Sequence, residues 1–334
     1  MNEENNLKDD LDFWATNSEE GGWNISSTDE GSQKMLEEED EKQIKIQTGS
    51  DVVDDYVYSE ETTDDERMIV NMGPQHPSTH GVLRLQVELE GEVVRRVKPV
   101  IGYLHTGMEK TGEELAYFQG PTNTTRMDYL SPLFNELVFS LTTEKLLNIE
   151  VPERAKAIRI LMTELNRISS HLVALATGGM DIGALSMMIF GFRERELILN
   201  FFEKTSGLRM NHNYIRPGGV AADLPDNWQK DVKEILKIIP EKLKDYDEML
   251  LDNPIWQGRL KNVGILTTEE CFAYGITGPS LRASGFSWDL RKTQPYSGIE
   301  NYEFEVPLLT DSDVFSRWRI KVLEIFESLK IVEQ

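Results

Sequence analysis

The chain has 334 residues, of which 39% are hydrophobic, so it is long enough to bury the core of one large or two ordinary domains. Its formal net charge is −23, but residues 1–66 carry 22 acidic residues against 4 lysines, whereas residues 67–334 carry 36 acidic against 31 basic residues. The acidity therefore belongs to a terminal extension, and no basic groove for nucleic acid is evident.

Residues 1–66 have the composition of a disordered, solvated extension, because runs of acidic residues alternate there with Ser, Gly and Asn. A role as an adaptor for a partner, through Trp14 and Trp23, is the alternative. We predict that residues 67–334 form the folded domain.

Cys271 is the only cysteine of the chain. No disulfide framework and no cysteine-ligated iron–sulfur or zinc site can therefore be built within it. The chain shows no secretory signal, no apolar run that would span a bilayer, and no glycine-rich dinucleotide fingerprint at a strand–helix turn. These features predict a cytoplasmic protein that reaches a membrane only through partners.

The predicted elements change from strands to helices along the chain. Alternating apolar residues over 83–89, then Gly91 and a second apolar segment, predict an antiparallel hairpin or small sheet within residues 67–105. Residues 106–334 show helical periodicity, and in one long helix the apolar positions follow the 3-4 spacing of a bundle core. We expect an α+β fold, with an N-terminal antiparallel β-sheet packed on a mainly helical bundle body. The predicted helices cover residues 127–147, 152–176, 181–204, 226–251 and 313–332, and Thr267 with Glu270 forms a capping box.

The pair Gly178-Gly179 is expected to end the second helix, and Asp181 to cap the next one. Arg159 and Asn166 fall on faces of the second helix other than its apolar stripe. Tyr129, at the start of the first helix, is typical of an amphipathic core residue whose hydroxyl reaches a backbone partner.

Residues 73–85, Gly-Pro-Gln-His-Pro-Ser-Thr-His-Gly-Val-Leu-Arg-Leu, carry two of the five histidines, His76 and His80. Proline and glycine fix this loop at the edge of the predicted sheet. Histidine exchanges a proton near neutral pH, since its ordinary pKa is about 6.5, so the loop suits proton chemistry on a bound ligand. On spacing alone, however, two histidines in such a turn are more typical of loop packing. A zinc site with this spacing would need both histidines on a helix, and the prolines prevent a helix here.

This loop, together with Gly-Tyr-Leu-His-Thr-Gly at 102–107, Arg-Met-Asp-Tyr-Leu at 126–130 and Ile-Arg-Pro-Gly-Gly-Val at 215–220, resembles the D subunit of bacterial NADH-quinone oxidoreductase, the 49-kDa subunit family of respiratory complex I. The resemblance runs from about Met68 to Gln334. It implies the fold of nickel–iron hydrogenase large subunits, although the Cys-x-x-Cys pairs that hold the hydrogenase metals are absent, so we expect no hydrogen chemistry.

The resemblance also implies an activity and a set of partners. The implied activity is that of a translocase, in which electrons from NADH reduce quinone while protons are translocated across the membrane. The chain would be a peripheral protein on the cytoplasmic face of the bacterial cell membrane. Its partners would be the small, cluster-bearing B subunit, the C and I subunits, and the membrane-embedded H subunit.

The family's quinone-binding residues fall on His80, from His-Gly-Val, and Tyr129, from Met-Asp-Tyr. A reduced quinone needs two protons, which an imidazolium and a tyrosine hydroxyl can deliver. The family's aspartate in Asp-Ile-Gly falls on Asp181, where it would pair with His80 and reload it. The resemblance also assigns His76 to the quinone cavity, with loop packing as the alternative. It places Arg216 near the iron–sulfur cluster of the adjacent subunit, with a surface or interface salt bridge as the alternative.

The sequence departs from the family at three places. Thr106 stands where many members have a cluster-side arginine, and Asn211 stands where some have a histidine that makes cluster reduction pH-dependent, with His212 one place later. Family members also continue beyond the equivalent of Gln334, so we expect either a C-terminally truncated chain or a missing segment that is supplied separately.

Two other interpretations stay open. One is a structural or vestigial subunit without quinone-site activity. The other is a metal hydrolase that uses His76, His80 and Asp181. The sequence leaves the choice between ubiquinone and menaquinone undecided.

Overall fold

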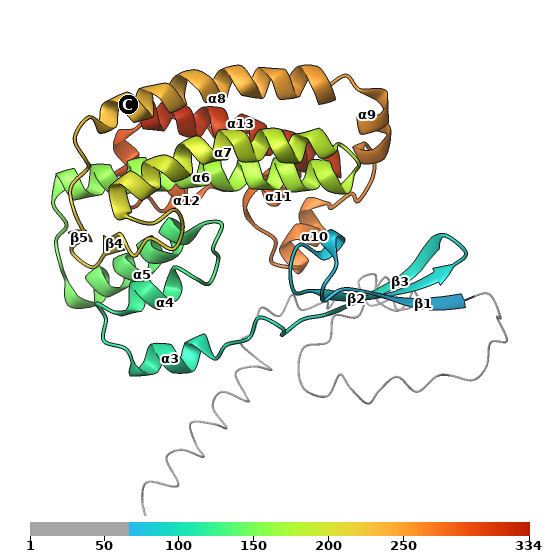
Figure 1. The fold of residues 1–334 in the computed structure, drawn as a ribbon, viewed down its shortest axis with the longest axis horizontal. Coiled ribbons are helices and arrows are strands. Elements are labelled where there is room, and N and C mark those ends of the chain that lie inside the picture. Colours follow the sequence, from blue (N-terminus) through green and yellow to red (C-terminus); the bar gives the residue numbers. More distant parts are fainter. Residues whose placement is uncertain (1–66) are drawn as a thin grey trace, which may run out of the picture. The chain divides into compact units, whose positions relative to one another are not determined.

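The computed structural model of the chain describes residues 67–334 (Figure 1). The chain divides into two compact units, one that ends at His105 and one that comprises Thr106–Gln334. The extension predicted to be disordered, residues 1–66, lies outside the described residues, as do Trp14 and Trp23.

The first unit holds an antiparallel three-stranded sheet with the strand order β1-β2-β3. The strands are β1 (Arg67–Met72), β2 (Arg84–Glu90) and β3 (Val93–Val100), and the register pairs Met72 with Leu85. Gly91, at a positive φ of 60°, occupies the tight turn between β2 and β3, which glycine enters without steric cost. The predicted antiparallel sheet is therefore confirmed.

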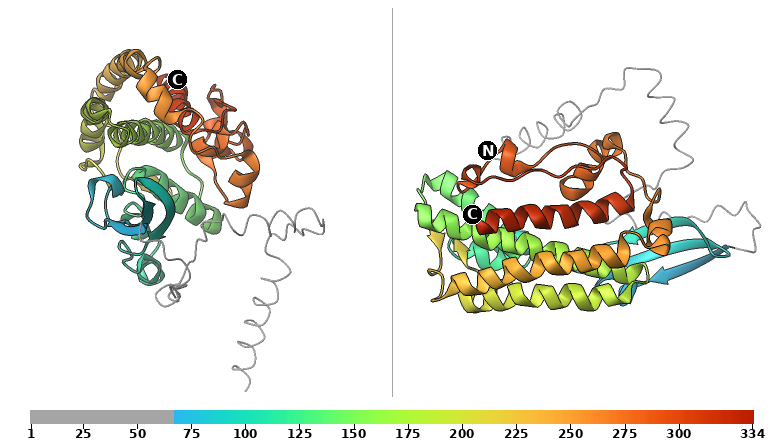
Figure 2. Two further views of the ribbon diagram at one scale, coloured as in Figure 1. Left: turned by 90° about the vertical axis from the view of Figure 1, so that its right-hand side faces the viewer. Right: turned by 90° about the horizontal axis from the view of Figure 1, so that it is seen from above.

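The second unit is mainly helical, as predicted, and four long helices hold its core (Figures 1 and 2). They are α6 (Glu153–Asp181), α7 (Leu185–Ser206), α8 (Trp228–Leu250) and α13 (Val314–Glu333). The apolar stripe predicted on α6 lies at the centre, because Leu165, Ile168 and Leu172 are fully buried. Burial of each such side chain stabilises the fold by about 1.5–3 kcal/mol.

Shorter elements complete this unit. The helices α3 (Met108–Glu114), α4 (Gly120–Thr124) and α5 (Pro132–Leu147) precede α6, and a two-stranded ribbon, β4 (Ile215–Arg216) with β5 (Gly219–Val220), joins α7 to α8. Between α8 and α13 lie α9 (Pro254–Leu260), α10 (Thr268–Ala273), α11 (Gly278–Ala283) and α12 (Leu290–Thr293). The predicted capping box at Thr267 and Glu270 is present at the start of α10.

Three helix boundaries differ from the prediction. Helix α6 continues through Gly178-Gly179 and ends at Asp181, while α7 begins only at Leu185. The reason is packing: a Cβ on Gly179 would lie 2.7 Å from the Cβ of Met187, so glycine here allows α6 and α7 to approach closely. The first predicted helix begins at Pro132 instead of residue 127, because residues 125–131 form turns ahead of it.

None of the helices in residues 67–334 combines the length and the apolar character needed to cross a bilayer.

Candidate functional site

The loop that carries His76 and His80 is a short 3-10 turn, Pro77–Thr79, between β1 and β2. His76 caps its start, since the ring Nδ1 accepts a hydrogen bond from the Ser78 amide at 3.2 Å and lies 2.6 Å from the Ser78 hydroxyl. His80 ends the turn at a φ of 48°, in the left-handed region. Both side chains are exposed, so the turn presents two imidazoles on a backbone of fixed conformation.

The turn that carries Tyr129 is held at both of its ends. Before it, the Thr125 hydroxyl donates a hydrogen bond to the Glu136 carboxylate at 2.7 Å. After it, the buried Asn166 amide donates to the Leu130 carbonyl at 3.0 Å. Tyr129 itself is 46% exposed, so it is not the core residue that its place beside an apolar helix predicts.

Arg216 lies at the tip of the β4–β5 ribbon, which a buried ion pair holds in place. Arg159 of α6 is fully buried and pairs with Glu144 of α5 at 2.5 Å. The same guanidinium donates to the Arg216 carbonyl at 2.8 Å and to the Gly219 carbonyl at 2.9 Å. Glu144 also accepts a hydrogen bond from the Gly218 amide, so the Arg-Pro-Gly-Gly turn is bound from both sides.

The Arg216 side chain is exposed, and its Nε donates to the Asn213 carbonyl at 3.0 Å. The contact of this arginine in the structure is therefore a backbone carbonyl of its own loop. A guanidinium in this position keeps its remaining donors for an anionic or polar partner.

Asp181 is the last residue of α6 and not the cap of the next helix. Fifteen residues of helix separate it from Asn166, which corresponds to about 22 Å along the axis of α6. The helical unit thus brings the Tyr129 turn and the Arg216 ribbon onto α5 and α6, while Asp181 lies at the far end of α6. His76 and His80 belong to the sheet unit.

His212, one place after the position expected for a cluster-side histidine, is buried. Burial lowers the pKa of His212 to about 4, against the opposing effect of the hydrogen bond to the Leu208 carbonyl. Its Nδ1 lies 3.0 Å from that carbonyl, and its ring packs edge-on against Phe202. Neutral His212 is thus a packing residue of this loop, and the redox-linked proton is not expected from it.

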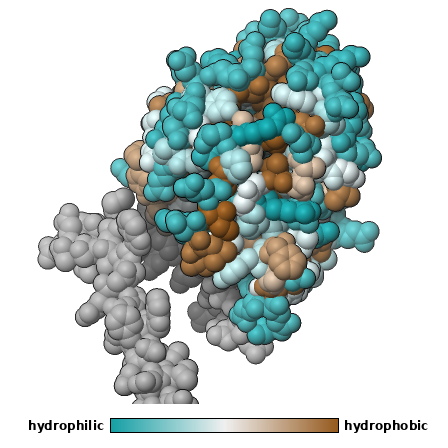
Figure 3. Space-filling view, turned by 90° about the vertical axis from the view of Figure 1, so that its left-hand side faces the viewer, coloured by the Kyte–Doolittle hydropathy of each residue, from teal (hydrophilic) through white to brown (hydrophobic). Residues whose placement is uncertain are grey.

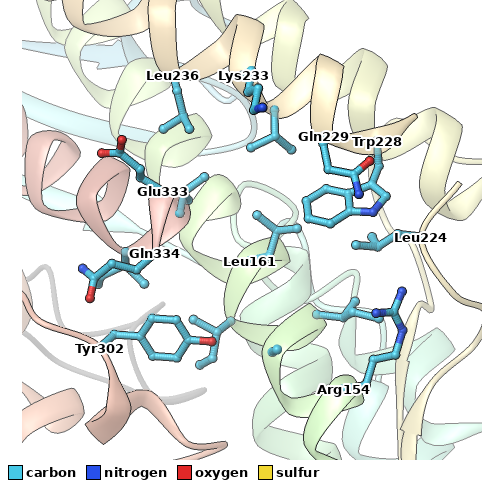
Figure 4. A pocket seen from close by; sticks show the side chains of 16 residues that line it. Arg154, Leu161, Leu224, Trp228, Gln229, Lys233, Leu236, Tyr302, Glu333 and Gln334 are labelled. Atoms are coloured by element: carbon cyan, nitrogen blue, oxygen red, sulfur yellow. The ribbon is translucent and has the colours of Figure 1, made fainter. Parts of the chain in front are cut away.

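A groove of about 480 Å³ opens on the helical unit between the start of α6, the start of α8 and the end of α13 (Figure 4). Apolar side chains such as Leu161 and Trp228 line it, together with Arg154 and Lys233. Figure 3 shows the face of the molecule that lies on the left in Figure 1, where apolar side chains lie between polar ones. None of the five predicted site residues lines this groove, so it is not the predicted quinone cavity.

Within residues 67–334, no group of three or more His, Cys, Asp or Glu side chains is arranged to hold a metal ion. The three residues of the metal-hydrolase interpretation, His76, His80 and Asp181, form no such group.

Sequence reasoning did not identify the residues that position the candidate site. Glu136, Glu144, Arg159 and Asn166 are all buried polar side chains of α5 and α6. The available signal was the spacing of the two glutamates, since positions eight apart lie on one face of a helix, and that face of α5 also carries Leu133 and Leu137. Charged residues on an apolar helix face indicate buried partners.

Comparison with known proteins supports the motif assignment. Residues 181–334 match the family model described as "Respiratory-chain NADH dehydrogenase, 49 Kd subunit". The chain is 59% identical to the first of the NADH-quinone oxidoreductase D subunits of Salinispora arenicola and 60% identical to the NADH-quinone oxidoreductase D subunit of Rhodococcus jostii, in each case over 81% of this chain and 62% of the relative.

A third relative, the NADH-quinone oxidoreductase D subunit of Mycobacteroides abscessus, is 55% identical over 87% of this chain and 68% of its own length. A match of this extent includes the segment from His76 to Arg216. The chain spans less than two thirds of the length of the first two relatives. At these identities and this coverage, the chain belongs to the family of the NADH-quinone oxidoreductase D subunit, the 49-kDa subunit of respiratory complex I.

Proposed function

We propose that this chain is the quinone-reducing subunit of an NADH-quinone oxidoreductase complex, in which His80 and Tyr129 bind the quinone headgroup. Electrons that enter from NADH elsewhere in the complex reach quinone through an iron–sulfur cluster of a neighbouring subunit. Quinone reduction is coupled to proton translocation. The chain itself holds neither flavin nor metal in this proposal, and quinone is its substrate.

The observation that carries the proposal is the Tyr129 turn. It belongs to a motif of the family, it is bonded to the helical core at both ends, and it leaves the tyrosine ring exposed. A catalytic hydroxyl must be held by a rigid support and still reach its ligand, and this turn meets both requirements.

The chemistry of the reaction sets the roles of the side chains. A quinone that takes up two electrons must also take up two protons. The Tyr129 hydroxyl orients one carbonyl oxygen and donates a proton to it, and the His80 imidazolium does the same for the other. Asp181 is assigned by family analogy to the reloading of His80, and His76 to the quinone cavity.

Arg216 is the proposed contact toward the iron–sulfur cluster of the adjacent subunit. Its exposed guanidinium and its rigid ribbon support this role, because a positive charge near a cluster stabilises the reduced, more negative form. The proposed partners are the small B subunit, which carries the cluster, the C and I subunits, and the membrane-embedded H subunit. The proposed location is the cytoplasmic face of the bacterial cell membrane, with membrane contact through these partners.

The test is NADH-driven quinone reduction in bacterial membranes whose own 49-kDa subunit has been replaced by this chain, either unmodified or with His80→Ala or Tyr129→Phe. NADH oxidation by hexacyanoferrate, which bypasses quinone, is the control. We expect both substitutions to abolish quinone reduction and to leave the control rate unchanged. Assembly of the complex without quinone reduction by the unmodified chain would favour the alternative of a structural subunit.

A further inference from the structure

Glu136 of α5 is a fully buried carboxylate whose four hydrogen-bond partners are all uncharged donors. One donor is the hydroxyl of Thr125, at 2.7 Å. The other three are the consecutive backbone amides of Asn213, Tyr214 and Ile215, at 2.6, 2.9 and 2.9 Å. Hydrogen bonds to an ionised acceptor are about twice as strong as neutral ones, so this carboxylate joins its donors firmly.

The donors come from two segments that are far apart in the sequence. Thr125 caps the end of α4 and shortly precedes Tyr129 in the turn that follows. Ile215 is the first residue of β4 and directly precedes Arg216. Glu136 therefore bonds, through one side chain, both the segment leading into Tyr129 and the segment leading into Arg216.

Glutamine would not satisfy these four donors. A glutamine has one acceptor oxygen, and its amide nitrogen would replace either the oxygen that bonds Thr125 and Asn213 or the oxygen that bonds Tyr214 and Ile215. Burial raises the pKa of Glu136, while the four hydrogen bonds oppose that shift by favouring the ionised form. The cost of this burial is offset only as long as all four bonds are made, so the two segments are held together as one unit.

We propose that Glu136 is a positioning residue for quinone reduction, which keeps the Tyr129 turn and the Arg216 loop in one fixed arrangement. The proposal rests on the proposed function, since it takes Tyr129 as a quinone-binding residue and Arg216 as the residue toward the cluster. Glu136 touches neither quinone nor the cluster in this role. It sets the geometry between the point where electrons arrive and the point where the headgroup is held.

Thr125→Val is the sharpest test, because valine has nearly the shape of threonine and removes only the hydroxyl bond to Glu136. The measurement is the kcat and KM for quinone in the assembled complex, with the hexacyanoferrate rate as a control for content and folding. We expect the KM for quinone to rise about tenfold, since a bond to a charged acceptor is lost at the Tyr129 end. Thr125→Ser, which keeps the hydroxyl, should restore the KM to within about twofold.

Thr143→Val is the matched control. Thr143 is a buried threonine of α5 whose hydroxyl donates to the Phe139 carbonyl of its own helix, and it joins no two segments. We expect its kinetics to equal those of the unmodified chain. Equal kinetics for Thr125→Val and Thr143→Val, with Tyr129→Phe still impaired, would overturn the positioning role alone. Unchanged kinetics for Tyr129→Phe would instead overturn the proposed function, and this proposal with it.

A double-mutant cycle tests the link between the two segments. If Glu136 couples them, the effect of Thr125→Val together with Arg216→Lys on kcat/KM differs from the product of the single effects by more than about twofold. The cycle of Thr143→Val with Arg216→Lys should be multiplicative. Multiplicative behaviour in both cycles would show that the two segments act independently and would overturn the proposal.

Discussion

Replacement of Arg159 by methionine should unfold the helical unit at a markedly lower temperature. Arg159 is fully buried, and its guanidinium bonds the Glu144 carboxylate and the carbonyls of Arg216 and Gly219. Methionine fills much of the same volume but leaves Glu144 as an unpaired buried charge. Removal of one partner of a buried ion pair costs about 3–5 kcal/mol.

For a unit of this size, each kcal/mol corresponds to about 2–4 °C, so the Tm of the Arg159→Met chain should fall by roughly 10 °C. The assay is thermal unfolding followed by circular dichroism at 222 nm, with denaturant unfolding to give the free energy. The double variant Arg159→Met, Glu144→Leu also removes the unpaired charge. Its free energy of unfolding should therefore exceed that of the single variant by at least about 1 kcal/mol.

Arg154→Met is the matched control, because Arg154 lies on the same helix and also pairs with a carboxylate, Asp223, at 2.7 Å. Both of these side chains are mostly exposed, so the loss of their pair should leave the Tm nearly unchanged. A loss of less than about 1 kcal/mol for Arg159→Met, or equal losses for the two variants, would refute the argument from burial.

Three further predictions concern the same unit. Gly191→Ala should lower the free energy of unfolding by about 1–3 kcal/mol, because the new Cβ would lie 2.8 Å from a side chain of α6. Gly178→Ala should not destabilise the unit, because its new Cβ would have no neighbour within 4 Å. Urea unfolding of the two variants measures the difference. Acidification from pH 7.5 to pH 5 should lower the free energy of unfolding by about 2 kcal/mol through His212. The reason is that this histidine binds a proton below about pH 6.5 in the unfolded chain but only below about pH 4 in the folded chain. The unfolding free energy of a His212→Phe chain should lack this pH-dependent component. Asn166→Leu should lower the free energy of unfolding by about 2 kcal/mol and should speed amide hydrogen exchange selectively in the Tyr129 turn. Exchange that is faster all along α6, with no selectivity for this turn, would contradict the anchoring role of Asn166.

The elements that local pattern defines were predicted correctly. The apolar stripe of α6, the capping box at Thr267 and the β2–β3 hairpin depend on residues close in sequence, so periodicity and turn chemistry suffice to predict them. The helix end predicted at Gly178-Gly179 was wrong. Gly179 lies inside α6 because the close packing against α7 leaves no room for a Cβ, and a rule based on neighbouring residues does not include this effect. The tertiary context overrides the local preference there.

The candidate site divides in the same way. Motifs identified Tyr129 and Arg216, but only the folded chain shows that both are attached to α5 and α6. Glu136 and Arg159 could not be predicted as positioning residues, because their partners lie 77 and 60 residues away, at Asn213 and Gly219. Arg159 was placed off the apolar stripe of α6, and it is nonetheless buried, because a second side of that helix packs against α5 and the ribbon.

The most direct test of the quinone proposal is photolabelling of the assembled complex, containing this chain, with a quinone whose headgroup carries an azide. Mass spectrometry then identifies the labelled peptides, and an excess of unmodified quinone serves as the competitor. The account predicts competed label on the peptides that contain His80 and Tyr129. Competed label on another subunit only, with none on either of these peptides, would contradict it.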